Sequence, residues 1–141
     1  MTVPAHEQQV THTYLVHYPT HAPRKSDPYY RTFEAYRKRT VATARCQFAI
    51  DRHGDDSECD LAHPLELHHH HIELAMMNEV DFALLEPFYP GISNPRKLGE
   101  WINGADNLVY YCRWHHRGHA GVHSATSSDF EASHFVRHLI S

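Results

Sequence analysis

The sequence lacks the features of a membrane or secreted protein. Its longest apolar runs, Phe82–Leu85 and Leu108–Tyr111, are far shorter than the ~20 residues that a membrane-spanning helix needs. Its first residues do not show a positively charged segment followed by an apolar one, as a secretion signal would. We therefore expect a cytoplasmic protein with no membrane partner.

Cysteine is scarce as well. The chain has only Cys46, Cys59 and Cys112, and an odd number of cysteines without a secretion signal does not describe a disulfide framework. This excludes the class of small secreted domains that disulfides hold together. We expect reduced thiols, and metal binding is the first function to consider for them.

Internal repeats and low-complexity linkers are also missing, and 141 residues suit one domain rather than two independent ones. Within it, we expect an N-terminal extension over residues 1–45 and a main domain over residues 46–141. The extension should contain a short strand near residues 13–18 and an amphipathic helix over residues 29–45, whose outer face is basic.

An excess of positive charge is missing too, since the net charge is −4. The distribution is nevertheless uneven: residues 24–52 contain eight basic and three acidic side chains, and residues 55–106 contain eleven acidic and two basic ones. A phosphate responds to the local field more than to the total charge. The basic segment is therefore either a solvated helix face or a phosphate-binding surface.

Histidine, in contrast, is abundant, with 16 of 141 residues, four of them consecutive at residues 68–71. An expression tag is the trivial explanation of such a run, but tags sit at termini, and this run lies inside patterned sequence. At neutral pH most imidazoles are uncharged and can coordinate a transition metal through one ring nitrogen. The run therefore points to a metal site.

The segments around this run predict an α+β fold. Hydrophobic spacing and turn signals give strands at residues 64–71 and 108–111, separated by helical patterns. The further expected elements are a strand or turn at 47–50, helices at 73–85 and 96–103, a short helix from His115 onward, and a closing helix at 129–140.

Two segments, taken in order, resemble the HNH nuclease family. They are residues 65–69 (LELHH) and residues 107–116 (NLVYYCRWHH), and the resemblance covers roughly residues 46–123. It implies a ββα-metal unit, in which a β-hairpin and one helix hold a single divalent ion against a DNA phosphate. It also implies flanking helices and makes residues 46–141 the nuclease domain.

The resemblance assigns a role to each matching residue. His68 becomes the first metal ligand and His69 the general base, because neighbours on a strand point to opposite faces. Asn107 fixes the loop that orients the base, and His116 is the second metal ligand. A register in which His70 and His71 take the first two roles remains open. The third ligand departs from the family pattern, and His119 or His123 would replace it.

A structural zinc knuckle is also implied, because Cys112 and His115 have the spacing of the second half of a family knuckle. With Cys46 and Cys59 they form a Cys3His set, an accepted zinc composition. Twelve residues separate Cys46 from Cys59, rather than the two of the family pattern. The alternatives are a knuckle with an inserted loop, or cysteines that remain only as small buried hydrophobes.

The leading functional hypothesis is a metal-dependent HNH endonuclease that cleaves DNA with low sequence selectivity. Its catalytic ion would be Mg, Mn, Ni, Co or Zn. The alternatives are a zinc-dependent nucleic-acid-binding module without cleavage, and a metal store. Some phage members of the family assist DNA packaging, so phage packaging proteins are a further partner class. The basic residues expected to contact nucleic acid are Arg37, Lys38, Arg39 and Arg117.

Overall fold

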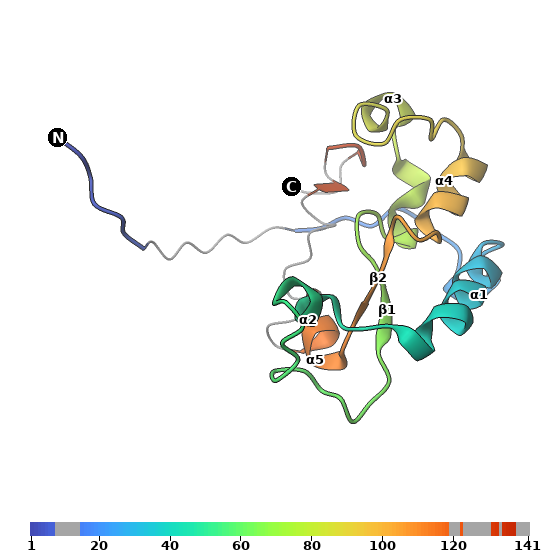
Figure 1. Cartoon of the computed structure of the whole chain (residues 1–141). Helices are drawn as coiled ribbons and strands as arrows, with labels where there is room; N and C mark the ends of the chain where they lie inside the picture. Colours follow the sequence, from blue (N-terminus) through green and yellow to red (C-terminus); the bar gives the residue numbers. More distant parts are fainter. Residues whose placement is uncertain (8–14, 119–121, 123–130, 133, 138–141) are drawn as a thin grey trace.

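A short antiparallel hairpin lies at the centre of the computed structural model, which describes residues 1–7, 15–118, 122, 131–132 and 134–137 (Figure 1). The fold is α+β, as predicted, with a two-stranded sheet among short helices. The elements are η1 Arg24–Ser26, α1 Tyr30–Thr40, η2 Val41–Thr43, α2 Gln47–Asp51, β1 Glu66–His69, η3 Leu74–Glu79, α3 Phe82–Leu85, α4 Pro95–Ile102, β2 Leu108–Tyr111 and α5 Arg113–Arg117. Within these ranges, no helix has the length and apolar character needed to cross a membrane.

The register of the hairpin decides which side chains share a face. β1 pairs with β2 so that Glu66 lies opposite Tyr111 and His69 opposite Leu108. Because side chains alternate along a strand, Leu67 and His69 point to one face, and Glu66 and His68 point to the other. The two consecutive histidines are therefore held on opposite sides of the sheet.

Helices cover both faces of the hairpin. On the first face, Phe33 of α1 forms a core with Leu67, Leu108 and Tyr110. On the second face, α2 and α5 contact the strands, and Tyr111 packs among the three cysteines. Helix α1, from the expected N-terminal extension, thus packs directly on the strands of the expected main domain.

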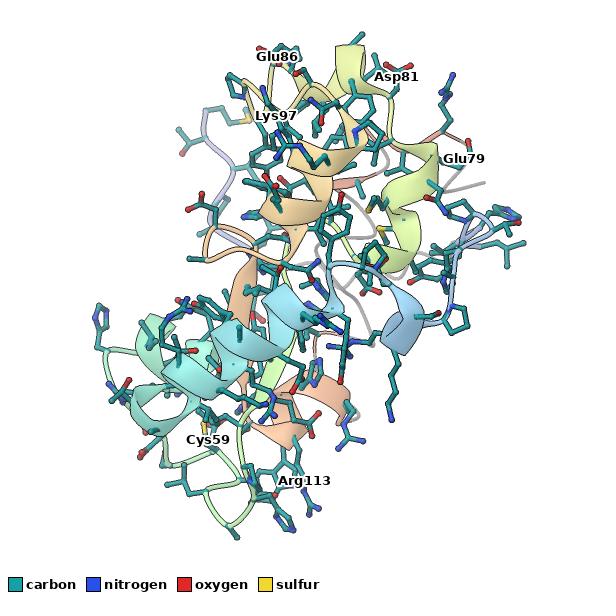
Figure 2. All side chains as sticks on the ribbon, turned by 90° about the vertical axis from the view of Figure 1, so that its right-hand side faces the viewer. Cys59, Glu79, Asp81, Glu86, Lys97 and Arg113 are labelled. Carbon is teal, nitrogen blue, oxygen red and sulfur yellow. The ribbon has the colours of Figure 1, made fainter. Side chains whose placement is uncertain are left out.

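A separate apolar core forms beyond the end of the hairpin where η3, α3 and α4 lie (Figure 1). Residues of the C-terminal segment complete it, and Val136 makes an isolated β-bridge with Val80. In Figure 2 Glu79, Asp81, Glu86 and Lys97 mark this end, and Cys59 and Arg113 mark the opposite one. The buried residues of this apolar core are Ile72, Met76, Val80, Leu85, Ile92, Leu98, Ile102, Ala132, Phe135 and Val136.

One expected element was wrong in type, and another is interrupted. Residues 47–51 form helix α2 rather than a strand or turn, with Ala49 buried against the cysteines and Gln47 hydrogen-bonded to Asp51 (2.8 Å). The helix expected over residues 73–85 is divided. Val80 is extended, where it bridges to Val136, and the carboxylate of Asp81 then caps α3 by accepting from two backbone N–H groups. Tertiary pairing overrides helical periodicity here.

The remaining elements agree more closely with expectation. Helix α1, continued by η2, occupies residues 30–43 of the expected 29–45, and β1, α4 and β2 lie within two residues of the expected bounds or inside them. The short helix begins at Arg113 rather than His115 and ends at Arg117. At the next residue, Gly118, a Cβ atom would approach the carbonyl oxygen of Trp114 to 2.3 Å.

Both ends of the chain differ from expectation. In the expected strand over residues 13–18, the described residues 15–18 contribute only a bridge at Val16, and residues 13–14 lie outside the description. In the expected closing helix over residues 129–140, Glu131 and Ala132 are helical, but residues 134–137 form turns and the bridge to Val80. The rest of that helix falls on residues that are not described.

The side chain of Asn107 connects the hairpin to its surroundings. It is fully buried, and its Oδ1 accepts from the backbone N–H groups of His71 (2.7 Å) and Ile72 (3.1 Å). Its Nδ2 donates to the carbonyls of Ile72 (2.8 Å) and Ile102 (2.9 Å). One amide thus fixes the segment after β1 against the end of α4.

Replacing Asn107 by Leu should destabilise the protein strongly. Four backbone groups would lose their partner, three of them in the buried residues Ile72 and Ile102. Each buried group costs about 1–3 kcal/mol, so we expect a loss of at least about 3 kcal/mol in the free energy of unfolding. Urea denaturation measures it. The control is Asn94→Ala, which removes the side-chain cap of α4 (Asn94 Oδ1 to Lys97 N, 3.0 Å) and should cost about 1 kcal/mol. Equal losses in the two variants would contradict the role of Asn107.

Candidate metal centres

Four residues that are remote in sequence meet at the end of the hairpin. Cys46 precedes α2, Cys59 lies in the loop before β1, Cys112 follows β2, and His115 is in α5. One ligand atom from each lies within 4.8 Å of the others. The fold therefore brings the predicted Cys3His set together, although twelve residues separate Cys46 from Cys59.

The distances suit a tetrahedral ion. His115 Nδ1 lies 3.1 Å from the sulfur of Cys112, 3.7 Å from that of Cys59 and 3.8 Å from that of Cys46. Zinc bonds of about 2.3 Å to sulfur and about 2.0–2.1 Å to nitrogen place such ligand atoms about 3.5 Å apart. The three cysteines are buried and form no disulfide.

Neighbouring groups hold these ligands in place. The backbone N–H of Cys112 donates to the sulfur of Cys46 (3.2 Å), and the ring of Phe48 stacks on His115 with centroids 3.8 Å apart. Burial, together with the nearby sulfurs of Cys46 and Cys112, raises the pKa of the Cys59 thiol to about 12. A bound cation would reverse this preference, because it favours thiolates.

A second pair of candidate ligands lies on the face of β1 that carries His68. The rings of His68 and His116 are edge-on, with centroids 5.1 Å apart, and both residues are buried. Two imidazoles on one tetrahedral ion have centroids about 5 Å apart, given metal–nitrogen bonds of about 2.0–2.1 Å. The hairpin and α5 thus give this pair a spacing that suits a shared ion.

Glu66 orients one member of this pair. His116 Nδ1 donates to Glu66 Oε2 (2.7 Å), which leaves Nε2 as the nitrogen with the lone pair. Glu66 also accepts from the Arg117 guanidinium. Although burial opposes ionisation, the hydrogen bonds from Arg117 and His116 hold the pKa of Glu66 below its usual value. The predicted third ligands, His119 and His123, lie outside the described residues.

His69 lies on the opposite face of β1, against the ring of Phe33 (5.2 Å between centroids). Its Nε2 is 3.0 Å from Asn103 Oδ1, and Asn103 Nδ2 donates to the carbonyl of Gly99 (3.1 Å). Since Asn103 Oδ1 can only accept, His69 carries its proton on Nε2, and Nδ1 has the lone pair. Burial lowers the pKa of His69 to about 4, so the ring is neutral at pH 7.

The sequence did not reveal Asn103. The resemblance gave the role of orienting the general base to Asn107. The amide of Asn107 hydrogen-bonds the backbone after β1, whereas Asn103 hydrogen-bonds the ring of His69 itself. Asn103 is buried at the C-cap position, directly after α4, and only the Asn-Gly turn signal marked its position.

The contacts of the other two histidines of the run lead toward the C-terminal segment. His71 Nδ1 is 2.7 Å from Glu131 Oε2, and the hydroxyl of Tyr89 donates to the same carboxylate. His71 also stacks on Trp101, with centroids 6.1 Å apart, and the ring of His70 is 4.5 Å from that of His71. This network connects the run to the C-terminal segment, and it was not foreseen.

The basic residues expected to bind nucleic acid are placed unequally. Arg37 pairs with Glu34 (2.9 Å) and Arg117 with Glu66, while Lys38 and Arg39 are exposed. A cavity of about 450 Å³ opens beside His116. The basic side chains that line it are Arg24, Lys25 and Arg37, of which the sequence analysis had singled out the last alone.

Comparison of the chain with known proteins adds no identification: no protein-family model matches it, and neither a curated protein nor a solved structure does.

Metal removal tests the cysteine cluster. Because a structural zinc contributes about 10 kcal/mol or more, comparable to the whole stability of a domain, chelation should unfold this end of the protein. We expect Cys59→Ser and His115→Ala to lose zinc, measured by elemental analysis, and to lose helix signal in circular dichroism. The control is His53→Asn, an exposed imidazole of the same region at φ 58, a conformation that Asn tolerates. Zinc content that is unchanged in all three variants would contradict the site.

Protonation of His69 should make stability depend on pH. Its folded-state pKa of about 4 lies below the ordinary value of 6.5, so the unfolded chain binds more protons between these values. Stability is therefore lost as the pH falls from about 6.5 toward about 4. The urea midpoint should drop more between pH 7 and pH 5 in the wild type than in His69→Gln, and His53→Asn should follow the wild type. Parallel behaviour of wild type and His69→Gln would refute a neutral, buried His69.

Proposed function

We propose that the protein is a metal-dependent endonuclease of the HNH type that hydrolyses DNA phosphodiester bonds. The observation that carries this proposal is the pairing of His68 with His116 across β1 and α5, at a ring separation of 5.1 Å. Two strands followed by a helix, with a buried Asn just before the second strand, support this proposal, because the resemblance implies such a unit.

The chain's own residues divide the chemistry. His69 is a neutral imidazole whose Nδ1 has the lone pair, so this nitrogen would take the proton from an attacking water. The burial that keeps the ring neutral also makes it a weak base. Asn103 holds the opposite nitrogen and fixes the ring. A divalent ion held by His68 and His116 would supply charge stabilisation to the phosphate and to the leaving 3′ oxygen. Imidazole ligands favour Zn, Ni, Co or Mn over Mg.

The cysteine cluster has a different task in this proposal. Four protein ligands close a tetrahedral shell, which is the pattern of a structural zinc, whereas a catalytic zinc keeps an open position. Its ligands come from the loop around α2 and from the β2–α5 junction. Zinc there would hold α5, and therefore His116, against the hairpin.

One observation favours a second candidate, a zinc-dependent nucleic-acid-binding module without cleavage. His69 is partly buried between Phe33 and Asn103, on the face of β1 opposite His68. In that case the histidine pair and the cluster would be structural, and His69 would be dispensable for nucleic-acid binding. Replacement of His69 separates the two candidates.

Cleavage of supercoiled plasmid with a panel of divalent ions tests the proposal. His69→Gln should lower the single-turnover rate by about 10²–10⁴-fold while metal and DNA binding persist, because only proton transfer is lost. His116→Ala should lose both cleavage and one bound ion, and His53→Asn should cleave like the wild type. Cleavage by metal-free protein in EDTA, or an undiminished rate in His69→Gln, would rule out this mechanism.

A further inference from the structure

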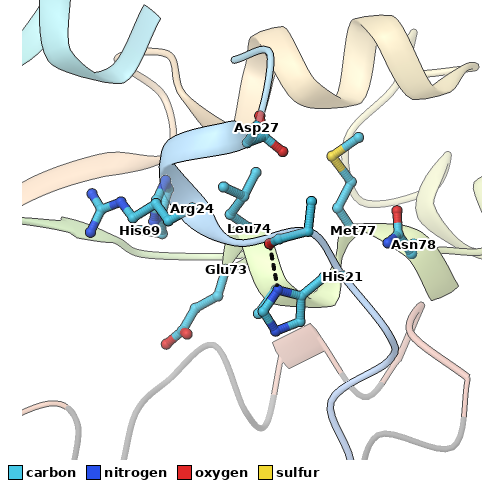
Figure 3. Close-up of a pocket in the computed structure, with 10 residues that line it drawn as sticks. His21, Arg24, Asp27, His69, Glu73, Leu74, Met77 and Asn78 are labelled. Carbon is cyan, nitrogen blue, oxygen red and sulfur yellow. Dashed lines mark hydrogen bonds between the residues drawn. The ribbon is translucent and has the colours of Figure 1, made fainter. Parts of the chain in front are cut away.

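Arg24 lies at two cavities that follow one another along β1. It lines a cavity of about 240 Å³ together with His69 and Glu73, and the cavity of about 450 Å³ that His116 also lines. Figure 3 shows Arg24 beside His69 at one end of the smaller cavity, with Met77 and Asn78 at the other end. Arg24 is therefore the residue that connects the face of His69 with the surroundings of His116.

An aromatic ring holds this arginine in place. The Arg24 guanidinium lies 4.1 Å from the centroid of the Phe33 ring, and the same ring packs against His69 at 5.2 Å. Phe33 is buried, with 4% of its surface exposed, so it cannot shift easily. A guanidinium that stacks on an aromatic face keeps its N–H groups available at the edge of the plane.

No ion pair among the described residues engages the guanidinium of Arg24. Arg37 and Arg117, the other arginines near His116, pair with Glu34 and Glu66. Among the described residues, no carboxylate forms an ion pair with Arg24. The nearby Asp27 carboxylate accepts from the backbone N–H of Tyr29 (2.7 Å) instead. Glu34 lines the larger cavity, and Arg24 helps to lower its pKa, but its ion pair is with Arg37. An arginine that lies between two cavities and forms no ion pair with a described residue is suited to bind an anion.

We infer that Arg24 binds the phosphodiester itself, through the two non-bridging phosphate oxygens, between His69 and His116. This inference rests on the proposed function and names a substrate contact for it. The planar guanidinium matches two phosphate oxygens at once, which an ammonium group cannot do. Arg24 would thereby place the scissile phosphate within reach of both histidines, and it would count as a catalytic residue because it touches the substrate.

The test compares Arg24→Ala and Arg24→Lys with the wild type. Arg96→Ala serves as the matched control, because Arg96 is an exposed arginine of α4 that pairs with Glu100 (3.0 Å). We expect Arg24→Ala to lower plasmid cleavage by about 10–100-fold, Arg24→Lys to recover part of it, and millimolar guanidinium to restore activity to Arg24→Ala alone. Cleavage by Arg24→Ala at the rate of Arg96→Ala would overturn the inference.

A binding measurement on metal-loaded protein, in the His69→Gln background so that the duplex stays intact, separates this inference from the proposed function. The affinity for a duplex oligonucleotide falls as salt rises, and the steepness of log affinity against log salt counts the phosphate contacts. Loss of one contact in Arg24→Ala should make this slope less steep by about 1, and Arg96→Ala should leave it unchanged. A smaller slope, with a wild type that never cleaves, would support the phosphate contact and refute the nuclease. An unchanged slope, with a wild type that does cleave, would refute the contact and leave the nuclease standing.

Discussion

The pairing register of β1 with β2 is the constraint on which the rest of the molecule depends. A slip by one residue would exchange the two faces of β1, so that His68 would meet Phe33 and His69 would meet α5. Two features fix this register. The amide of Asn107 bonds the backbone that leaves β1, and Leu67 and Leu108 share a core with α1. Both candidate functions depend on histidines that this register places.

The short hairpin is supported from both ends by different means. At one end lies the apolar core of η3, α3, α4 and the C-terminal segment, and the amide of Asn107 hydrogen-bonds Ile72 and Ile102 of that core. At the other, the packed residues include three cysteines and the cluster that His115 completes, so a bound ion would replace apolar area as the source of stability. A bound ion would therefore hold α5 in place even though little apolar surface surrounds it.

Phe33 links the hairpin to the chemistry proposed above. Its ring covers Leu67 in the core, packs against His69, and supports the guanidinium of Arg24. A residue that looks like ordinary core in a helical pattern therefore positions two polar groups. Asn103 acts similarly from the other side, since its buried amide selects the tautomer of His69. Within the described part of the chain, the neutral histidine is thus held by an aromatic ring and an amide, and no carboxylate bonds it.

By itself, the sequence determined the α+β class, the two strands and the four members of the Cys3His set. Apolar strands, a histidine run and a Cys-x-x-His spacing are local patterns that survive in the fold. Only the tertiary structure decided which histidine faces His116, that Asn103 bonds His69, and that residues 73–85 break at Val80. The physical reason is that these outcomes depend on strand register and on partners more than thirty residues away, which no local periodicity contains.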